Sequence, residues 1–464
     1  MLAKDIDAHI SSFFSKEELD RLARITGFNK RCEKGKLTGS MFLDLMVFNA
    51  DKLSDQTLES NCCYIEKKYG VIIKRQSISE RFNESSVFFL RTIFEMLLQK
   101  RFQFDRIPED FKKYNRVLIK DSTCFKVPSD LKDKYRGCGS AEKQTEAIVR
   151  IQLEYDLLSG CVTDMRIESF TNQDAANSAE TIDLIQPGDL IIRDLAYMHK
   201  MILQSIDNKK AFYSCRLDPR ISVFEYFNGQ YQKLNFAQIY EFMKENNISI
   251  LDKQVCLGNK KDGCTRLIIS VLPEELLQQR LLKAYKERKR IRGGEPSKEY
   301  KARAKLTLMI TNIPDTQLSA EHVQAVYMLR WQIELMFKTW KSVCGLASIK
   351  LVKGHRVDCY IHGKLIFILL SWNIIWSMFG FFYKSSKKTI SIYKANKVIL
   401  ERSQQLADLL IFKKGKPYQF FEKLFIALTR FCLCEPKKGD QHFIKIIISS
   451  FKAESDVISM AYDY

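Results

Sequence analysis

Three acidic residues that lie far apart in the sequence are candidates for one shared site. Asp121 and Asp194 each end a short apolar run that we predict to be a strand, and Glu334 lies in a predicted helix over residues 320–343. Converging carboxylates repel one another unless they bind divalent cations, for which hard oxygen donors are the preferred ligands. Two such cations can activate a nucleophile and stabilise the leaving oxygen of an in-line phosphoryl displacement. These residue types therefore predict nuclease or strand-transfer chemistry.

The helix predicted for residues 320–343 presents one polar and one apolar face. At helical spacing, the polar face holds four residues within about 60° of one another: Tyr327, Arg330, Glu334 and Lys341. The opposite face holds residues suited to burial: Leu329, Ile333, Met336 and Trp340. A simple surface helix is the alternative interpretation, because an i, i+4 pair such as Arg330 and Glu334 stabilises a helix by about 0.2–0.5 kcal/mol.

The four polar-face residues match the Y-x2-R-x3-E-x6-K signature of the insertion sequence 4 family of DDE transposases. Asp121, in Ile119-Lys120-Asp121-Ser122-Thr123, is similar to the first catalytic aspartate of that family. Asp194, at the start of Asp194-Leu195-Ala196-Tyr197, is similar to the second. The resemblance spans about residues 110–350 of the chain.

The resemblance implies an α/β fold with an RNase H-like mixed-sheet core, interrupted by a mostly β insertion and flanked by helical N- and C-terminal regions. It implies two Mg²⁺ ions, with Mn²⁺ as a substitute, held by three metal ligands: Asp121, Asp194 and Glu334. Three further residues are implied to contact the phosphates of the cleaved DNA end: Tyr327, Arg330 and Lys341. The implied activity is cut-and-paste excision and strand transfer of an insertion sequence at its terminal inverted repeats.

The composition agrees with a polyanion as partner. The chain has 464 residues, with 74 Lys and Arg against 55 Asp and Glu, and a formal net charge of +19. This balance excludes an acidic disordered protein and favours nucleic acid or an acidic membrane face. The 13 cysteines are scattered without a C-x-x-C pair, so neither a disulfide framework nor a zinc knuckle is expected. The cysteine pattern favours a reducing, cytoplasmic location. The resemblance to the transposase family further implies a protein of the bacterial nucleoid that binds transposon-end and target duplex DNA, as a homodimer and without a membrane.

The order of predicted elements is that of an α/β domain. The expected strands are residues 117–119, 146–155, 161–170, 189–194 and 211–216, with helices at 173–184 and 198–206. The expected parts of the chain are a helical DNA-binding region at 1–110, the first part of the catalytic core at 111–216, a β-rich insertion with a basic helix at 217–304, the second part of the core at 305–350, and a helical C-terminal region with a role in dimerisation at 351–464.

Two basic segments are further candidates for contact with DNA. Lys74 and Arg75 precede a predicted helix start with capping-box spacing from Ser77 to Glu80, which suits a small DNA-binding module or an ordinary solvated helix start. Residues 280–305 hold 11 Lys or Arg against three Glu. Such a run is usually a solvated face, but in this basic chain it favours a polyanion contact.

Residues 365–383 form an uncharged run of 19 residues flanked by lysines, which is long enough to span a bilayer. Because it is the one such run and contains polar residues, we favour a buried helix in the centre of a domain.

Some transposases of this group cut the second strand through a DNA hairpin and stack an aromatic residue of the insertion on a flipped base. The candidates here are Phe224, Tyr226, Phe227 and Tyr231, although core packing is the favoured role for each. The alternative to an active enzyme is a catalytically inactive, transposase-derived repressor or inhibitor that binds DNA.

Overall fold

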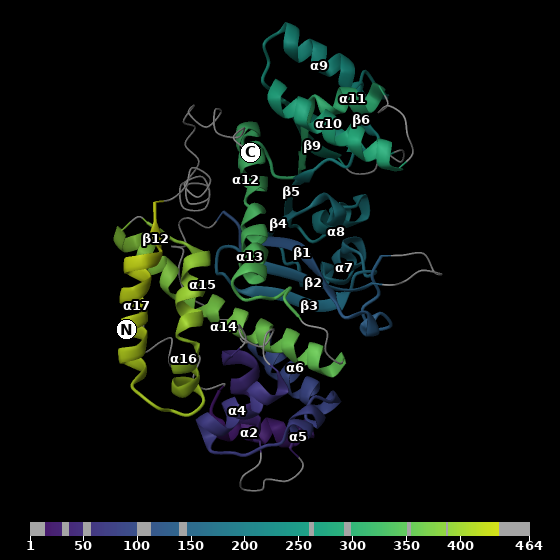
Figure 1. Ribbon diagram of the computed structural model, residues 1–464. Helices are drawn as coiled ribbons and strands as arrows, with labels where there is room; N and C mark the ends of the chain where they lie inside the picture. Colours follow the sequence, from purple (N-terminus) through teal and green to yellow (C-terminus); the bar gives the residue numbers. More distant parts are fainter. Residues whose placement is uncertain are drawn as a thin grey trace.

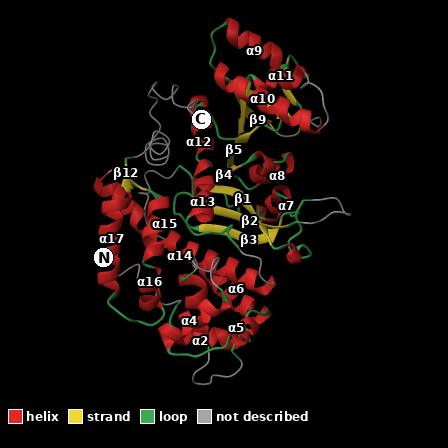
Figure 2. Cartoon of the chain, viewed as in Figure 1, coloured by secondary structure: helices red, strands yellow, loops and turns green. Residues whose placement is uncertain are grey.

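One mixed sheet of ten strands extends from the middle of the protein to one end and is accompanied by helices (Figure 1). The computed structural model describes residues 14–29, 37–49, 57–99, 113–138, 146–258, 264–291, 298–349, 354–386 and 388–435. Its strand order is β3-β2-β1-β4-β5-β10-β9-β8-β6-β7. Helices and strands alternate along the middle of the chain, whereas both flanking regions are mostly helical (Figure 2).

Five strands form the first half of the sheet: β1 (Val117–Val127), β2 (Ala147–Asp156), β3 (Val162–Ser169), β4 (Leu190–Arg193) and β5 (Phe212–Arg216). The first three are antiparallel neighbours, and β4 and β5 then run parallel to β1. This 3-2-1-4-5 arrangement is the mixed sheet expected for an RNase H-like core, so the predicted fold class is confirmed.

The prediction that Asp121 ends its strand is wrong. β1 continues for six residues beyond Asp121, to Val127, and each of them pairs with β2. Thr123, Phe125 and Val127 favour extended backbone, which accounts for the longer strand. Asp194, by contrast, directly follows the last residue of β4, as predicted.

The second half of the sheet continues from β5 without a gap, because β10 pairs with β5 and β9 pairs with β10. Its strands are β6 (Val223–Phe227), β7 (Gln230–Lys233), β8 (Ile250–Leu257), β9 (Cys264–Val271) and β10 (Leu306–Thr311). Three helices accompany them: α9 (Phe236–Glu245), α10 (Glu274–Ile291) and α11 (Lys298–Ala304). The strand pattern of β8 and the helix α9 were not anticipated. These elements lie together at one end of the molecule (Figure 1).

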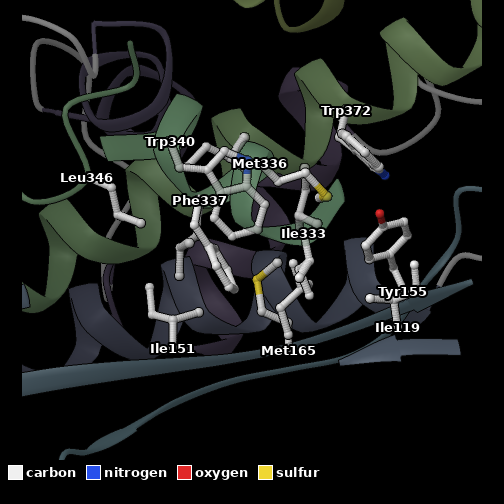
Figure 3. Close-up of a cluster of buried hydrophobic side chains, with 14 of the residues drawn as sticks. Ile119, Ile151, Tyr155, Met165, Ile333, Met336, Phe337, Trp340, Leu346 and Trp372 are labelled. Atoms are coloured by element: carbon white, nitrogen blue, oxygen red, sulfur yellow. The ribbon is translucent and has the colours of Figure 1, made fainter. Parts of the chain in front are cut away.

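Side chains alternate between the two faces of the first half of the sheet. On one face, Ile119 and Ile151 lie in one buried cluster with Ile333 and Phe337, and the ring of Tyr155 packs edge-on against Trp372 (Figure 3). This face is covered by α12 (Ala320–Met328), α13 (Trp331–Ser342) and α14 (Gly354–Ser386). The other face is next to α7 (Asp174–Glu180), two short 3₁₀ turns, η4 (Ile182–Leu184) and η5 (Leu195–Tyr197), and α8 (Lys200–Asn208).

Helices of both ends of the chain pack around α14. The N-terminal elements are α2 (Lys16–Ile25), α3 (Gly39–Leu43), η1 (Asp44–Phe48), α4 (Leu58–Tyr69), α5 (Arg75–Glu80) and α6 (Glu84–Gln99). The C-terminal elements are α15 (Ile392–Glu401), α16 (Ser403–Leu410) and α17 (Pro417–Cys432), with a small sheet of β11 (Thr389–Ile390) and β12 (Leu433–Cys434). In the middle of the chain, a short 3₁₀ turn, η3 (Ser129–Leu131), follows β1.

The capping box predicted at Ser77 is wrong. The helix α5 begins at Arg75, and the residue before it, Lys74, is the last one with extended backbone and makes no side-chain capping bond. Ser77 therefore lies within the helix, where it cannot cap the N-terminus.

The apolar run at residues 365–383 lies in α14, and the residues described there confirm burial rather than exposure. Among the described residues, α14 is the one helix long and apolar enough to cross a membrane, and 94% of its apolar window is buried inside the protein. Trp372 Nε1 donates to the carbonyl oxygen of Gly160 at 2.8 Å, and Trp376 lies against the same glycine. Gly160 has a φ of +70° in the turn between β2 and β3, so both the turn and the tryptophan contact require glycine.

Candidate active site

Two neighbouring parallel strands bring Asp121 and Asp194 together. β1 and β4 are in register, with Lys120 opposite Arg193, so the next residue on each strand is an aspartate. Asp194 retains an extended backbone and directly precedes the 3₁₀ turn η5. Both carboxylates consequently lie at the same edge of the parallel strand pair.

The helix predicted over residues 320–343 is in fact two helices. α12 ends at Met328 and α13 begins at Trp331. Between them, the backbone N–H groups of Leu329 and Arg330 bond to carbonyl oxygens three residues earlier, at 3.2 and 3.0 Å. This 3₁₀-type tightening interrupts the regular α-helical spacing and places Arg330 at the junction. The predicted apolar face is confirmed, since Ile333, Met336 and Trp340 are buried with Leu329.

Arg330 joins two of the three carboxylates. Its Nη1 donates to Oδ2 of Asp121 at 2.8 Å, and its Nη2 donates to Oε1 of Glu334 at 2.5 Å. The third carboxylate, Asp194, accepts a hydrogen bond from the hydroxyl of Tyr327 at 3.1 Å. Three acidic residues from distant parts of the chain therefore converge on the junction of α12 and α13.

The electrostatics of this cluster favour a cation. Burial is the main cause that raises the pKa of Asp121 to about 6. The charges of Asp194 and Glu334 act in the same direction, whereas the backbone N–H of Ser122 and the charge of Arg330 act against it. Burial, together with the charge of Asp194, raises the pKa of Tyr327 to about 12. Three partly buried carboxylates with a single guanidinium among them are a donor set that fits a hard divalent cation.

In this structure, Arg330 occupies the space between two of the carboxylates. Among the residues that the structure describes, no three His, Cys, Asp or Glu side chains are close enough to hold a metal ion. Arg330 lies between Asp121 and Glu334 and already bonds to both. A cation can join those carboxylates only if the guanidinium moves away from them.

Lys341 lies at the other end of α13 and bonds to the protein backbone. Its Nζ donates to the carbonyl oxygen of Cys124 on β1 at 3.0 Å. The three residues expected to contact phosphate, Tyr327, Arg330 and Lys341, are thus all directed towards β1 and the carboxylates.

Comparison with known proteins decides the family. The family model described as "Transposase DDE domain" matches residues 113–370. A transposase for insertion sequence element IS231E of Bacillus thuringiensis subsp. finitimus is 32% identical, over 100% of this chain and 96% of that protein. The chain belongs to the DDE transposases. A transposase for IS231F of B. thuringiensis subsp. israelensis is 30% identical over 98% of this chain and 95% of its own length.

Two more distant comparisons concern transposases as well. A transposase for IS1151 of Clostridium perfringens is 26% identical over 84% of this chain and 85% of that protein. A solved piggyBac transposase synaptic complex with hairpin DNA has 11% identity and a TM-score of 0.39, and the alignment covers 92% of this chain and 80% of that chain. Family membership confirms the predicted DNA transposase function and implies dependence on a divalent metal.

Next to the carboxylates, this DDE transposase has a polar network that sequence reasoning missed. Asp174, the first residue of α7, accepts hydrogen bonds from Ser122 at 2.9 Å, Gln152 at 3.0 Å and Tyr197 at 3.0 Å. It also pairs with Arg150. Burial raises the pKa of Asp174, but the bond from Gln152 and the charge of Arg150 outweigh it and hold that pKa below its ordinary value. Because Ser122 follows Asp121 and Tyr197 closely follows Asp194, the network ties both aspartate segments of the transposase together.

A second missed feature is a buried ion pair on the same face of the sheet. Arg193 Nη2 donates to Glu154 Oε2 at 2.5 Å, and both side chains are fully buried. Lys120 is also buried, and its Nζ donates to Thr181 Oγ1 at 2.7 Å. Burial lowers the pKa of Lys120 to about 8. The sequence does contain a signal for these buried cations. Lys120 and Arg193 each come directly after an apolar run and directly before an aspartate.

The expectation that the aromatic residues of the insertion pack in the core is wrong for three of them. Tyr226, Phe227 and Tyr231 are 61%, 57% and 40% exposed. They lie on the hairpin of β6 and β7, and β7 is the last strand at the edge of the transposase sheet.

Proposed function

We propose that this protein excises and inserts an insertion sequence by Mg²⁺-dependent cut-and-paste transposition at terminal inverted repeats. The observation that carries the proposal is the convergence of Asp121, Asp194 and Glu334 on Tyr327 and Arg330. Strand β1, the end of β4 and helix α13 each supply one carboxylate.

In this proposal, Asp121, Asp194 and Glu334 would hold two Mg²⁺ ions, for which Mn²⁺ could substitute. Such ions would supply Lewis-acid stabilisation of the attacking and leaving oxygens of a phosphodiester. Strands β1 and β4 and helix α13 fix the positions of the three carboxylates. Asp174 accepts hydrogen bonds from Ser122, which follows Asp121 on β1, and from Tyr197 in the turn that follows Asp194.

Arg330 has two roles in this proposal. In the metal-free protein it neutralises Asp121 and Glu334. With a divalent cation held by Asp121 and Glu334, the guanidinium of Arg330 would no longer be needed as their counter-charge. It would then be free to donate to a phosphate of the DNA end, where its planar fork of donors suits two phosphate oxygens. Tyr327 and Lys341 would add a hydroxyl donor and a second positive charge.

Other parts of the chain are proposed to contact DNA or a second subunit. The exposed aromatic residues of the β6–β7 hairpin can stack on unpaired bases of any sequence, because every base has a flat aromatic face. We assign duplex binding to the helical region at residues 1–110 and to cations of residues 280–305, and dimerisation on DNA to residues 351–464. Part of the basic run is structural, since Arg280 donates to the carbonyl oxygens of Ala304 and Leu306 at 3.1 and 2.9 Å.

The test is cleavage of duplex DNA that carries the terminal repeats of the element. Purified protein should cut these ends in Mg²⁺ and join them to target DNA. Asp121→Asn, Asp194→Asn and Glu334→Gln should each lower the cleavage rate by about 10³-fold or more, because several kcal/mol of metal-dependent stabilisation is lost. Their binding to the same DNA should remain.

Two results would contradict the proposal. If all three variants cleave at the wild-type rate, the site assignment is wrong. If the wild-type protein binds its terminal repeats but never cuts them in Mg²⁺ or Mn²⁺, the protein is a repressor or inhibitor rather than an active enzyme.

A further inference from the structure

Two cysteines lie directly opposite each other on neighbouring strands, away from the carboxylates. Cys256 near the end of β8 pairs with Cys264 at the start of β9. Their sulfur atoms are 3.2 Å apart, and both thiols are free. Two such thiols can be oxidised to a disulfide if the backbone already suits the bond.

The strand register satisfies the geometric requirement. Directly opposite residues of an antiparallel pair have Cα atoms about 4.5–5.5 Å apart. This separation lies inside the range of about 4.4–6.8 Å found in disulfides. A disulfide bond is about 2.05 Å long, so the two sulfurs need to approach by only about 1 Å, which side-chain rotation can supply. The bond joins two strands that are already paired and leaves the sheet order unchanged.

The two thiols differ in their access to solvent. Cys264 is exposed, whereas Cys256 is 3% exposed. Burial raises the pKa of Cys256 to about 11, and the hydroxyl of Tyr231 and the charge of Lys200 act in the opposite direction. An oxidant from solvent therefore reaches Cys264 first, and Cys256 is the protected thiol behind it.

We propose that Cys256 and Cys264 are a reversible dithiol–disulfide couple that responds to peroxides. The Cys264 thiolate attacks one oxygen of hydrogen peroxide and forms a sulfenic acid, while the other oxygen leaves as water after taking up a proton. The Cys256 thiol then attacks the Cys264 sulfur and forms the S–S bond, and the hydroxyl leaves as a second water. Two thiols are oxidised by two electrons, and one peroxide is reduced to two waters. A dithiol reductant reverses the oxidation by thiol–disulfide exchange.

The experiment uses the full-length protein, fully reduced and then exposed to hydrogen peroxide under native conditions. Remaining thiols are blocked with N-ethylmaleimide, and tryptic peptides are analysed by mass spectrometry. Trypsin separates the two cysteines at Lys260 and Lys261, so the disulfide joins two distinct peptides, residues 254–260 and 262–266. We expect this linked pair, two hydrogens lighter than the sum of its parts, and its disappearance after treatment with dithiothreitol.

Cys63→Ser provides a matched control, because Cys63 is also exposed but lies on α4. This variant should form the linked peptides as the wild type does, whereas Cys256→Ser should leave Cys264 to stop at sulfenic or higher oxidation states. The proposal is wrong if the wild-type peptides carry N-ethylmaleimide on both cysteines after oxidation. It is equally wrong if Cys264 is over-oxidised while Cys256 stays a free thiol, or if either links to a different cysteine.

Discussion

Arg330 at the junction of α12 and α13 donates to Asp121 on β1 across 2.8 Å. The two residues are more than two hundred positions apart in the chain, and the same guanidinium also bonds to Glu334. This bridge holds α13 against the strand that carries the first aspartate. It also makes the arginine the counter-charge of the carboxylates in the metal-free protein.

Arg330→Gln should lower the stability of the metal-free protein and enlarge the stabilisation that Mg²⁺ provides. Without the guanidinium, Asp121 and Glu334 lose charged hydrogen bonds, at a cost of about 1–3 kcal/mol. Thermal unfolding with and without Mg²⁺ measures both effects. Arg21→Gln, which removes an exposed pair with Glu18, should change neither. If Mg²⁺ raises the unfolding temperature of the wild type and of Arg330→Gln equally, the arginine does not compete with the metal ion for the carboxylates.

Tyr197→Phe should destabilise the protein although it removes a single oxygen. The buried hydroxyl donates to Gln152 at 2.6 Å and contacts Asp174, so its loss leaves buried polar atoms with fewer partners. We expect a loss of about 1–3 kcal/mol in the free energy of unfolding, measured in urea. Tyr393→Phe, at a half-exposed position, is the control. Equal unfolding midpoints for both variants would exclude a structural role for the Tyr197 hydroxyl.

Glu154→Gln should be among the most damaging substitutions outside the site. It leaves the guanidinium of Arg193 buried without its counter-charge, which costs about 3–5 kcal/mol. The double variant Glu154→Leu with Arg193→Met should recover much of that loss, because no charge then remains buried. Urea unfolding of the three proteins tests this, with Glu146→Gln at an exposed pair as control. A double variant less stable than the single one would refute the argument.

The stability of the protein should fall as the pH drops below about 6.5, in part because of His362 on α14. Its buried ring has a lowered pKa, caused chiefly by burial, and Nδ1 bonds to the carbonyl oxygen of Asp358 at 2.8 Å. The unfolded chain, with an ordinary pKa near 6.5, therefore binds a proton that the folded chain resists. The contribution of the neutral His362 ring to the free energy of unfolding is complete above pH 6.5 and decreases below it.

His362→Gln should flatten this part of the pH dependence, as measured by urea unfolding between pH 5 and 8. His355→Gln, at an exposed position of the same helix, should keep the slope of the wild type. A slope that survives in His362→Gln would assign it to other groups.

Residue spacing predicted the elements that hold the site, but not the contacts between them. The apolar period of residues 329–340 predicted the buried face of α13, and the apolar runs before Asp121 and Asp194 predicted two strands of the core. Periodicity reports burial of a face, so it could not show the 3₁₀ junction at Arg330, which depends on backbone hydrogen bonds. It also suggested that Asp121 ends a strand, because the polar residues after it hide the continued pairing with β2.

The hydrogen-bond network around Asp174 could not be predicted from the sequence for a different reason. Asp174, Gln152 and Tyr197 come from three separate segments, and their proximity depends on the register of β1, β2 and β4 and on the packing of α7 and η5 against these strands. No local pattern in any of these segments encodes that register. The opposition of Cys256 and Cys264 likewise depends on where the hairpin of β8 and β9 turns.

The most direct test of the account is the number of Mn²⁺ ions that the protein binds on a cleaved terminal duplex. Isothermal titration calorimetry should show two bound Mn²⁺ ions per subunit for the wild type. For Asp121→Asn, Asp194→Asn and Glu334→Gln it should show fewer bound ions or a much lower affinity for them. If Mn²⁺ uptake is the same in all four proteins, the three carboxylates do not form the metal site and the proposed mechanism is wrong.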